Sequence, residues 1–249
     1  MRVLRVVSLA VIVFAASRSG FAWTAATRVR MVDDALKLMP PSLRQVLEAR
    51  REAVLRGMLT PMTDEDAPAH RPPWDGGSLP ASVDSAARAL IGASEGRASF
   101  GDVALRFGNL AHYVADAGFP PGAAGASGAD RYAHFAAFCQ DRRGRFPLVF
   151  YGHGSVFLAK ADDRGFTMTI LERARDEDKT LARAYAAAPS WDDGPSFDDR
   201  SVPFAMASLA YSHSVTDIVQ AWLSAWARCH GDLGGTPYAG KPSSTPSKP

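Results

Sequence analysis

The chain has 249 residues, of which 47% are hydrophobic and 22% charged, and its 28 basic residues nearly balance its 26 acidic ones. This balance excludes the strongly basic surface that is typical of nucleic-acid-binding proteins. The length fits one compact domain.

The N-terminus has the pattern of a secretory signal. Arg2 and Arg5 precede an apolar stretch at residues 6–16 and the small-residue sequence at residues 20–22. We therefore expect a signal peptide over residues 1–22 and a periplasmic or secreted protein that begins at Trp23. The apolar stretch is too short to cross a bilayer, and no later segment has about 18 uninterrupted apolar residues, so we expect no transmembrane segment.

Apolar residues at helical spacing follow one another along the rest of the chain. They predict helices over residues 26–39, 43–57, 82–93, 99–118, 130–142, 156–187 and 202–227. No alternating strand pattern of useful length occurs, so we expect a single all-α domain over residues 23–230. Residues 231–249 are rich in Gly, Pro, Ser and Lys, which predicts a disordered tail because such a segment buries little apolar surface.

The chain has two cysteines, Cys139 and Cys229. An oxidising compartment would allow them to form a disulfide, but their separation in sequence says nothing about their distance in space. The sequence leaves both the paired and the free state open.

His112 and Asp116 are the main candidates for chemistry. They stand four residues apart on a predicted helix, so both side chains project from one face. Imidazole nitrogen and carboxylate oxygen are normal zinc ligands, and a carboxylate can bridge two ions. A hydrogen-bonded pair that faces a neighbouring helix is the structural alternative. His213 and Asp217 have the same spacing, but no third donor lies near them in sequence.

Other catalytic motifs are missing from the sequence. It contains no Gly-x-Ser-x-Gly elbow, no phosphate-binding glycine-rich loop with a lysine and no His-Glu-x-x-His. Neither cysteine lies in a motif that indicates a nucleophile.

Taken together, Trp23 and the helical segment of His112, Tyr113 and Asp116, followed by Pro120, resemble the zinc-dependent phospholipase C family, which shares its fold with single-strand nucleases. The resemblance covers nearly the whole mature chain. It implies a multi-helix domain, zinc as cofactor, and a phospholipid or phosphodiester substrate. In that family, the amino and carbonyl groups of the leading Trp bind zinc, which implies that Trp23 is a ligand together with His112 and Asp116.

The resemblance also implies ligands in the loop at residues 60–80. His70 lies where the family has another ligand of the same ion. Asp64 and Asp66 are the candidates for the acidic catalytic residue expected shortly before it, although Met62 replaces the aspartate of the family's Pro-Asp pair. Solvent exposure is the simple alternative for a lone loop histidine such as His70.

Several family positions differ in this chain. Arg28 stands where a histidine ligand is expected, and an arginine has no lone pair to donate to zinc. Gly122 stands in place of another histidine. The His-x-x-x-acid pair of the next helix is matched at best by His134, with Phe138 in place of the acid.

These observations predict a metal-dependent phosphoric ester hydrolase with a reduced zinc site built from His70, His112 and Asp116. The alternative is a non-catalytic helical envelope protein that retains the fold and uses His112 and Asp116 as a structural pair. The differences at Arg28, Met62, Gly122 and Phe138 favour this second interpretation.

Overall fold

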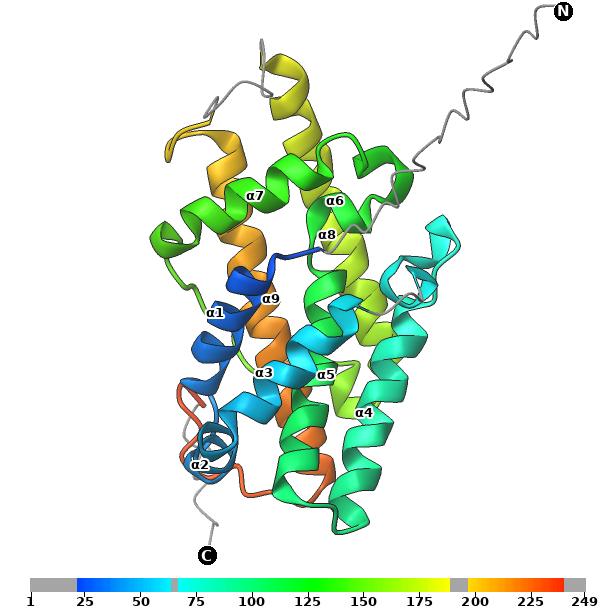
Figure 1. The fold of residues 1–249 in the computed structure, drawn as a ribbon, viewed down its shortest axis with the longest axis vertical. Helices are drawn as coiled ribbons and strands as arrows, with labels where there is room; N and C mark the ends of the chain where they lie inside the picture. Colours follow the sequence, from blue (N-terminus) through cyan, green and yellow to red (C-terminus); the bar gives the residue numbers. More distant parts are fainter. Residues whose placement is uncertain (1–21, 64–66, 189–196, 240–249) are drawn as a thin grey trace, which may run out of the picture.

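The structure, a computed structural model, describes residues 22–63, 67–188 and 197–239. Its helices form one bundle in which α5 runs near the middle (Figure 1). The described residues contain no strand, so the all-α fold class expected from the sequence is confirmed. The predicted signal peptide lies outside the described residues except for Ala22.

The helices follow the apolar periodicity of the sequence closely. The α-helices are α1 (Ala25–Leu36), α2 (Pro41–Ala49), α3 (Arg51–Leu59), α4 (Leu79–Glu95), α5 (Phe100–Ala117), α6 (Pro120–Ala123), α7 (Tyr132–Arg142), α8 (Asp163–Ala187) and α9 (Val202–Arg228). Short 3₁₀ segments link several of them, including η1 (Thr60–Thr63), η2 (Ala67–His70) and η3 (Pro73–Asp75).

Helix α5 forms the centre of the core and carries the candidate site. It begins at the expected cap, where the Oγ of Ser99 accepts a hydrogen bond from the backbone N–H of Asp102. It packs against α3, α4 and α9, and most of its last three turns are buried. A helix that is buried on several sides can hold polar side chains away from water only if they are paired.

Two glycines bring α3 and α5 unusually close together. A Cβ added at Gly57 would lie 1.9 Å from the carbonyl oxygen of Leu105, and one added at Gly108 would lie 2.0 Å from that of Val54. No side chain fits at either position, so the backbones touch directly. This close crossing places the end of α3 beside the side chain of His112.

The chain differs from the predicted helices at Arg50. The helix expected through residues 43–57 is divided into α2 and α3, because Arg50 adopts φ −125° and ψ 27° and leaves the helical conformation. Apolar spacing continues through this break and therefore does not reveal it.

The tail is ordered further than the sequence analysis expected. The carbonyl oxygen of Asp232 accepts hydrogen bonds from Trp226 Nε1 and Ser42 Oγ, both at 3.0 Å. His153 Nε2 donates to the carbonyl oxygen of Pro237 at 2.7 Å. Residues 231–239 are thus held against the bundle by polar contacts that composition does not predict, while residues 240–249 lie outside the described part.

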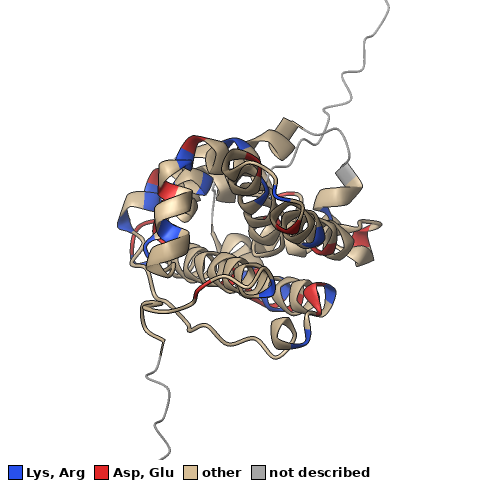
Figure 2. Cartoon of the chain, turned by 90° about the horizontal axis from the view of Figure 1, so that it is seen from below, with Lys and Arg blue, Asp and Glu red and all other residues tan. Residues whose placement is uncertain are grey.

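Lys and Arg residues alternate with Asp and Glu residues along the surface helices, without a face of one sign in this view (Figure 2). Among the described helices, none is both long and apolar enough to cross a membrane. Both cysteines are free thiols in the structure, with Cys139 buried and Cys229 partly exposed. Of the two states that the sequence left open, a disulfide or two free thiols, the structure therefore has the free thiols.

Candidate metal centre

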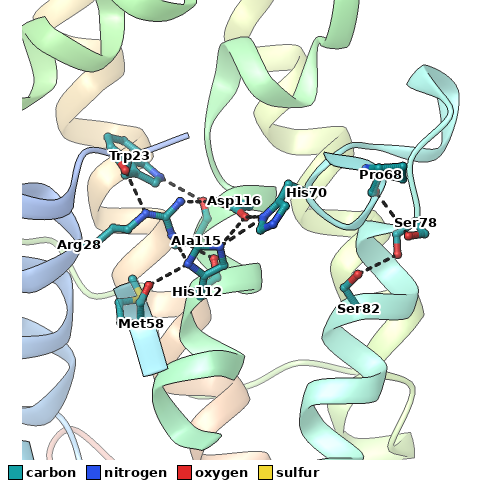
Figure 3. Close-up of polar contacts among 10 residues, drawn as sticks. All are labelled: Trp23, Arg28, Met58, Pro68, His70, Ser78, Ser82, His112, Ala115 and Asp116. Atoms are coloured by element: carbon teal, nitrogen blue, oxygen red, sulfur yellow. Dashed lines mark hydrogen bonds and ion pairs between the residues drawn. The ribbon is translucent and has the colours of Figure 1, made fainter. Parts of the chain in front are cut away.

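Three potential metal ligands meet at the C-terminal half of α5 (Figure 3). His112 and Asp116 project from α5, and His70 approaches from the end of η2. His70 Nδ1 lies 2.7 Å from Asp116 Oδ2 and 3.3 Å from His112 Nε2, and His112 Nε2 lies 3.2 Å from Asp116 Oδ2. The structure therefore brings together the three residues of the expected site.

Arg28 is the second partner of Asp116. Its Nη2 donates to Asp116 Oδ1, while its Nε donates to the carbonyl oxygen of Trp23 at 2.9 Å and its Nη1 to the carbonyl oxygen of His112 at 3.2 Å. Its side chain is fully buried. A buried guanidinium needs a carboxylate and several acceptors, and all of these are present here.

The carbonyl oxygen of Met58 determines which nitrogen of His112 carries the proton. It lies 2.8 Å from His112 Nδ1 and can only accept, so Nδ1 donates. In neutral His112 the lone pair is therefore on Nε2, the atom that faces His70 and Asp116. This is the usual arrangement of a metal-binding histidine, whose second nitrogen donates to a carbonyl or carboxylate.

The turn that carries His70 is attached to the start of α4. Ser78 donates to the carbonyl oxygen of Pro68 from its backbone N–H at 2.7 Å and from its Oγ at 3.4 Å, and Ser82 Oγ reaches the carbonyl oxygen of Ser78 at 3.4 Å (Figure 3). The His70 ring also packs on Tyr113, with ring centroids 5.4 Å apart. These contacts hold the loop histidine against α5.

The protonation states of the cluster follow from burial and charge. Burial alone would raise the pKa of Asp116, but the Arg28 charge and the two histidines outweigh it and hold that pKa well below its ordinary value. Burial lowers the pKa of His112, and the nearby Arg28 charge lowers it further. Near neutral pH, Asp116 is therefore a carboxylate and His112 a neutral imidazole, which are the forms that bind a metal ion.

The three ligand atoms lie close enough together to bind one ion. Zinc bonds of about 2.0–2.1 Å separate tetrahedral ligand atoms by about 3.3 Å, which matches two of the separations, 3.2 and 3.3 Å. The third, 2.7 Å between His70 Nδ1 and Asp116 Oδ2, is a hydrogen-bond distance. The lone pair of His112 Nε2 also faces the carboxylate of Asp116, and a cation between these electron-rich atoms would relieve their repulsion. The donor set is thus suitable for one zinc ion with an open fourth position.

Two of the other expected ligands have different partners. The carbonyl oxygen of Trp23 is bonded to Arg28, and its indole Nε1 donates to the carbonyl oxygen of Ala115 at 3.0 Å. His134 Nδ1 lies 2.7 Å from the hydroxyl of Tyr185 on α8 and does not join the group. The acidic candidates Asp64 and Asp66 lie outside the described residues.

The two positions that lack a family ligand have apolar surroundings. A Cβ at Gly122 would lie 3.3 Å from Phe119 and 3.5 Å from Tyr132, so the ring of Phe119 crowds the position where the family has a histidine. Phe138 is buried and packs on Phe135 and Phe197.

The second His-x-x-x-Asp spacing forms ion pairs instead of a metal group. His213 pairs with Glu177 at 2.7 Å, and Asp217 pairs with Arg173. Each partner comes from α8, so both side chains of this pair already have a polar partner.

Arg28 is the residue that sequence reasoning did not identify correctly. From the sequence, the replacement of a histidine by Arg28 indicated only the loss of a metal ligand. In the structure, Arg28 lies at the centre of the polar network. The sequence signal was an arginine on the buried face of an apolar helix, which requires an acidic partner elsewhere.

Comparisons with known proteins support the fold alone. No protein-family model matches the sequence, and no curated protein matches it either. Among solved structures, the alpha-toxin of Clostridium perfringens from an avian strain superposes with a TM-score of 0.60 at 13% identity, covering 88% of this chain and 66% of the toxin. The alpha-toxin of Clostridium absonum gives 0.58 at 15% identity, covering 89% and 67%. The chain thus spans about two thirds of the length of each toxin.

Proposed function

We propose that this protein is a secreted, metal-dependent hydrolase of phosphoric esters, of the phospholipase C type, with one zinc ion held by His70, His112 and Asp116. The observation that supports it most is that potential ligand atoms of these three residues all lie within 4.8 Å of one another. The fold shared with the alpha-toxins and the resemblance of the sequence support the proposal.

The charges of the site favour an anionic substrate. Arg28 neutralises Asp116, and the two histidines are neutral when they act as ligands, so a bound divalent ion leaves a net charge of +2. A buried excess of positive charge attracts a phosphate ester. Zinc, when bound, supplies Lewis-acid activation of water for attack on phosphorus.

The residues of this chain provide orientation and access. Arg28 holds Asp116 so that Oδ2 faces the histidines, and Met58 directs the lone pair of His112 toward the same point. The side chain of His70 is 16% exposed, whereas those of His112 and Asp116 are 0% and 4% exposed. Substrate therefore approaches from the His70 side.

One observation favours the alternative of a non-catalytic envelope protein. Arg28 and Asp116 already form a neutral, hydrogen-bonded pair, and this pair links α1 to α5 without any ion. In that case the cluster has a structural role only.

Hydrolysis measured on the mature chain separates the two functions. The protein beginning at Trp23 is loaded with zinc and tested on bis(4-nitrophenyl) phosphate and on phospholipid vesicles. We expect turnover that falls at least about 100-fold in His70→Ala and His112→Ala and is retained in His134→Gln. A zinc-loaded protein without turnover on either substrate would favour the non-catalytic alternative.

A further inference from the structure

A polar cavity lies between α4 and α5, directly beside the metal ligands. It has a volume of about 370 Å³. Its walls are formed by small residues of α4, by three polar residues of α5 and by the His70-bearing turn: Ala81, Ser82, Ser85, Ala86, Ala89, Arg106, Asn109, Tyr113 and Ala69. We call it the α4–α5 pocket.

The pocket and the metal cluster share a wall. Ala69, which precedes His70, lines the pocket, and the ring of Tyr113 contacts the rings of both His70 and His112. Ser82, another lining residue, donates to the carbonyl oxygen of Ser78, and Ser78 in turn donates to Pro68 of the His70 turn (Figure 3). A molecule in the pocket therefore lies next to the open side of the cluster.

Arg106 gives the pocket its charge. No hydrogen bond or ion pair of its guanidinium occurs among the described residues, and its Nε is buried without a partner. Among the described residues, no acidic side chain lines the pocket. A buried guanidinium donor without a partner carries a desolvation penalty that an anionic ligand would remove.

The spacing along α5 relates the two sites. Arg106, Asn109 and Tyr113 form one stripe, since they are three and four residues apart. Arg106 precedes His112 by six residues, which corresponds to about 9 Å along the helix axis. This rise places Arg106 one to two turns before the metal ligand His112 on the same helix.

We infer that the α4–α5 pocket binds an anionic group, a carboxylate or phosphate, on the alcohol portion of the substrate. This inference rests on the proposed function and adds a specificity to it: anionic headgroups are preferred over cationic ones. Arg106 binds the anionic group, and Asn109, Ser82 and Ser85 supply further polar contacts around it.

Binding and turnover with matched ligands test the inference. The probes are O-phosphoserine and phosphocholine, which share a phosphate. The far end of phosphoserine carries a carboxylate together with an ammonium group, whereas that of phosphocholine carries a quaternary ammonium alone. Calorimetry is done on the mature protein with and without zinc, and hydrolysis is measured on phosphatidylserine and phosphatidylcholine vesicles. We expect phosphoserine to bind about tenfold more tightly than phosphocholine. Arg106→Gln should remove this preference by weakening the binding of phosphoserine, and it should leave the zinc content unchanged.

Two further variants complete the test. Arg88→Gln removes an exposed arginine of α4 that pairs with Asp84 outside the pocket, and it should keep the preference. Arg106→Lys keeps the charge and should retain part of the preference for phosphoserine. Both Arg106 variants should unfold at the same temperature as the unmodified protein.

The inference is overturned if the two probes bind equally, or if Arg106→Gln retains the preference. An Arg106-dependent preference for phosphoserine in a protein that binds no zinc would contradict the proposed function but leave the anion pocket. Zinc-dependent hydrolysis that Arg106→Gln does not change would support the proposed function and overturn the anion pocket.

Discussion

Arg28 and Asp116 are 88 positions apart in the chain and form an ion pair in which both side chains are almost fully buried. The pair joins α1 to α5 and leaves one carboxylate oxygen of Asp116 facing the two histidines. The metal cluster therefore depends on a fixed positive charge of the protein itself.

Removal of this charge should destabilise the fold strongly. Arg28→Ala leaves the carboxylate of Asp116 buried without its partner and removes the donor to the carbonyl oxygen of Trp23. We expect the free energy of unfolding to fall by about 3–5 kcal/mol. Urea unfolding in the presence of a chelator measures this without a contribution from bound metal. The control is Arg88→Ala, which removes an exposed ion pair with Asp84 and should lower the free energy of unfolding by less than about 1 kcal/mol. Equal effects of the two variants would contradict the role of Arg28.

The glycine contact between α3 and α5 should be sensitive to a single methyl group. In Gly108→Ala the new Cβ would meet the carbonyl oxygen of Val54 at 2.0 Å, so the helices must separate and move Met58 away from His112. We expect a loss of stability of several kcal/mol, beyond the ~1–3 kcal/mol usual for overpacking, and weaker zinc binding.

Gly92→Ala is the matched control for this substitution. Gly92 lies inside α4 with nothing within 4 Å of an added Cβ, so alanine should stabilise the protein by up to about 1 kcal/mol. Thermal unfolding and zinc titration of both variants test the prediction. A stabilising Gly108→Ala would show that the two backbones are not in contact.

The metal-free protein should lose stability as the pH falls below about 6.5, the ordinary pKa of histidine. Burial lowers the pKa of His112 in the folded state, so the unfolded chain takes up the proton first. The slope from this one group reaches at most about 1.4 kcal/mol per pH unit.

Chemical unfolding between pH 8 and 5 in a chelator measures this dependence. We expect a smaller slope in His112→Gln than in the unmodified protein. The same slope in both proteins would mean that His112 does not titrate as the structure implies.

The two cysteines should react differently with a thiol reagent. Burial raises the pKa of the Cys139 thiol well above its ordinary value and shields it, whereas Cys229 is partly exposed. We expect rapid labelling of one thiol per native chain, at Cys229, and of two in denaturant. No labelling in denaturant without a reductant would indicate a disulfide and contradict the structure.

Most of the fold and part of the candidate site could be predicted from the sequence. Apolar periodicity located the long helices, and the spacing of His112 and Asp116 on one of them placed both side chains on one face. His70 was identified only through a family resemblance, because its approach to α5 depends on the path of a loop. The break at Arg50 and the contacts of Asp232 depend on local backbone and on long-range hydrogen bonds, which periodicity does not report.

The role of Arg28 could not be predicted for a related reason. Its partners come from Trp23, five residues away, and from His112 and Asp116, more than eighty residues away. Which charges meet across such distances is decided by the packing of α1 against α5, and a single sequence does not contain that information directly.

Elemental analysis of a protein truncated to begin at Trp23 tests the central claim most directly. The chain that begins at Trp23 is purified with zinc present, dialysed and measured beside His70→Ala, His112→Ala and the control His134→Gln. We predict about one zinc ion per chain in the unmodified protein and in His134→Gln, and almost none in the other two. An unmodified protein without zinc, or zinc that remains in His70→Ala and His112→Ala, would contradict the proposed metal centre.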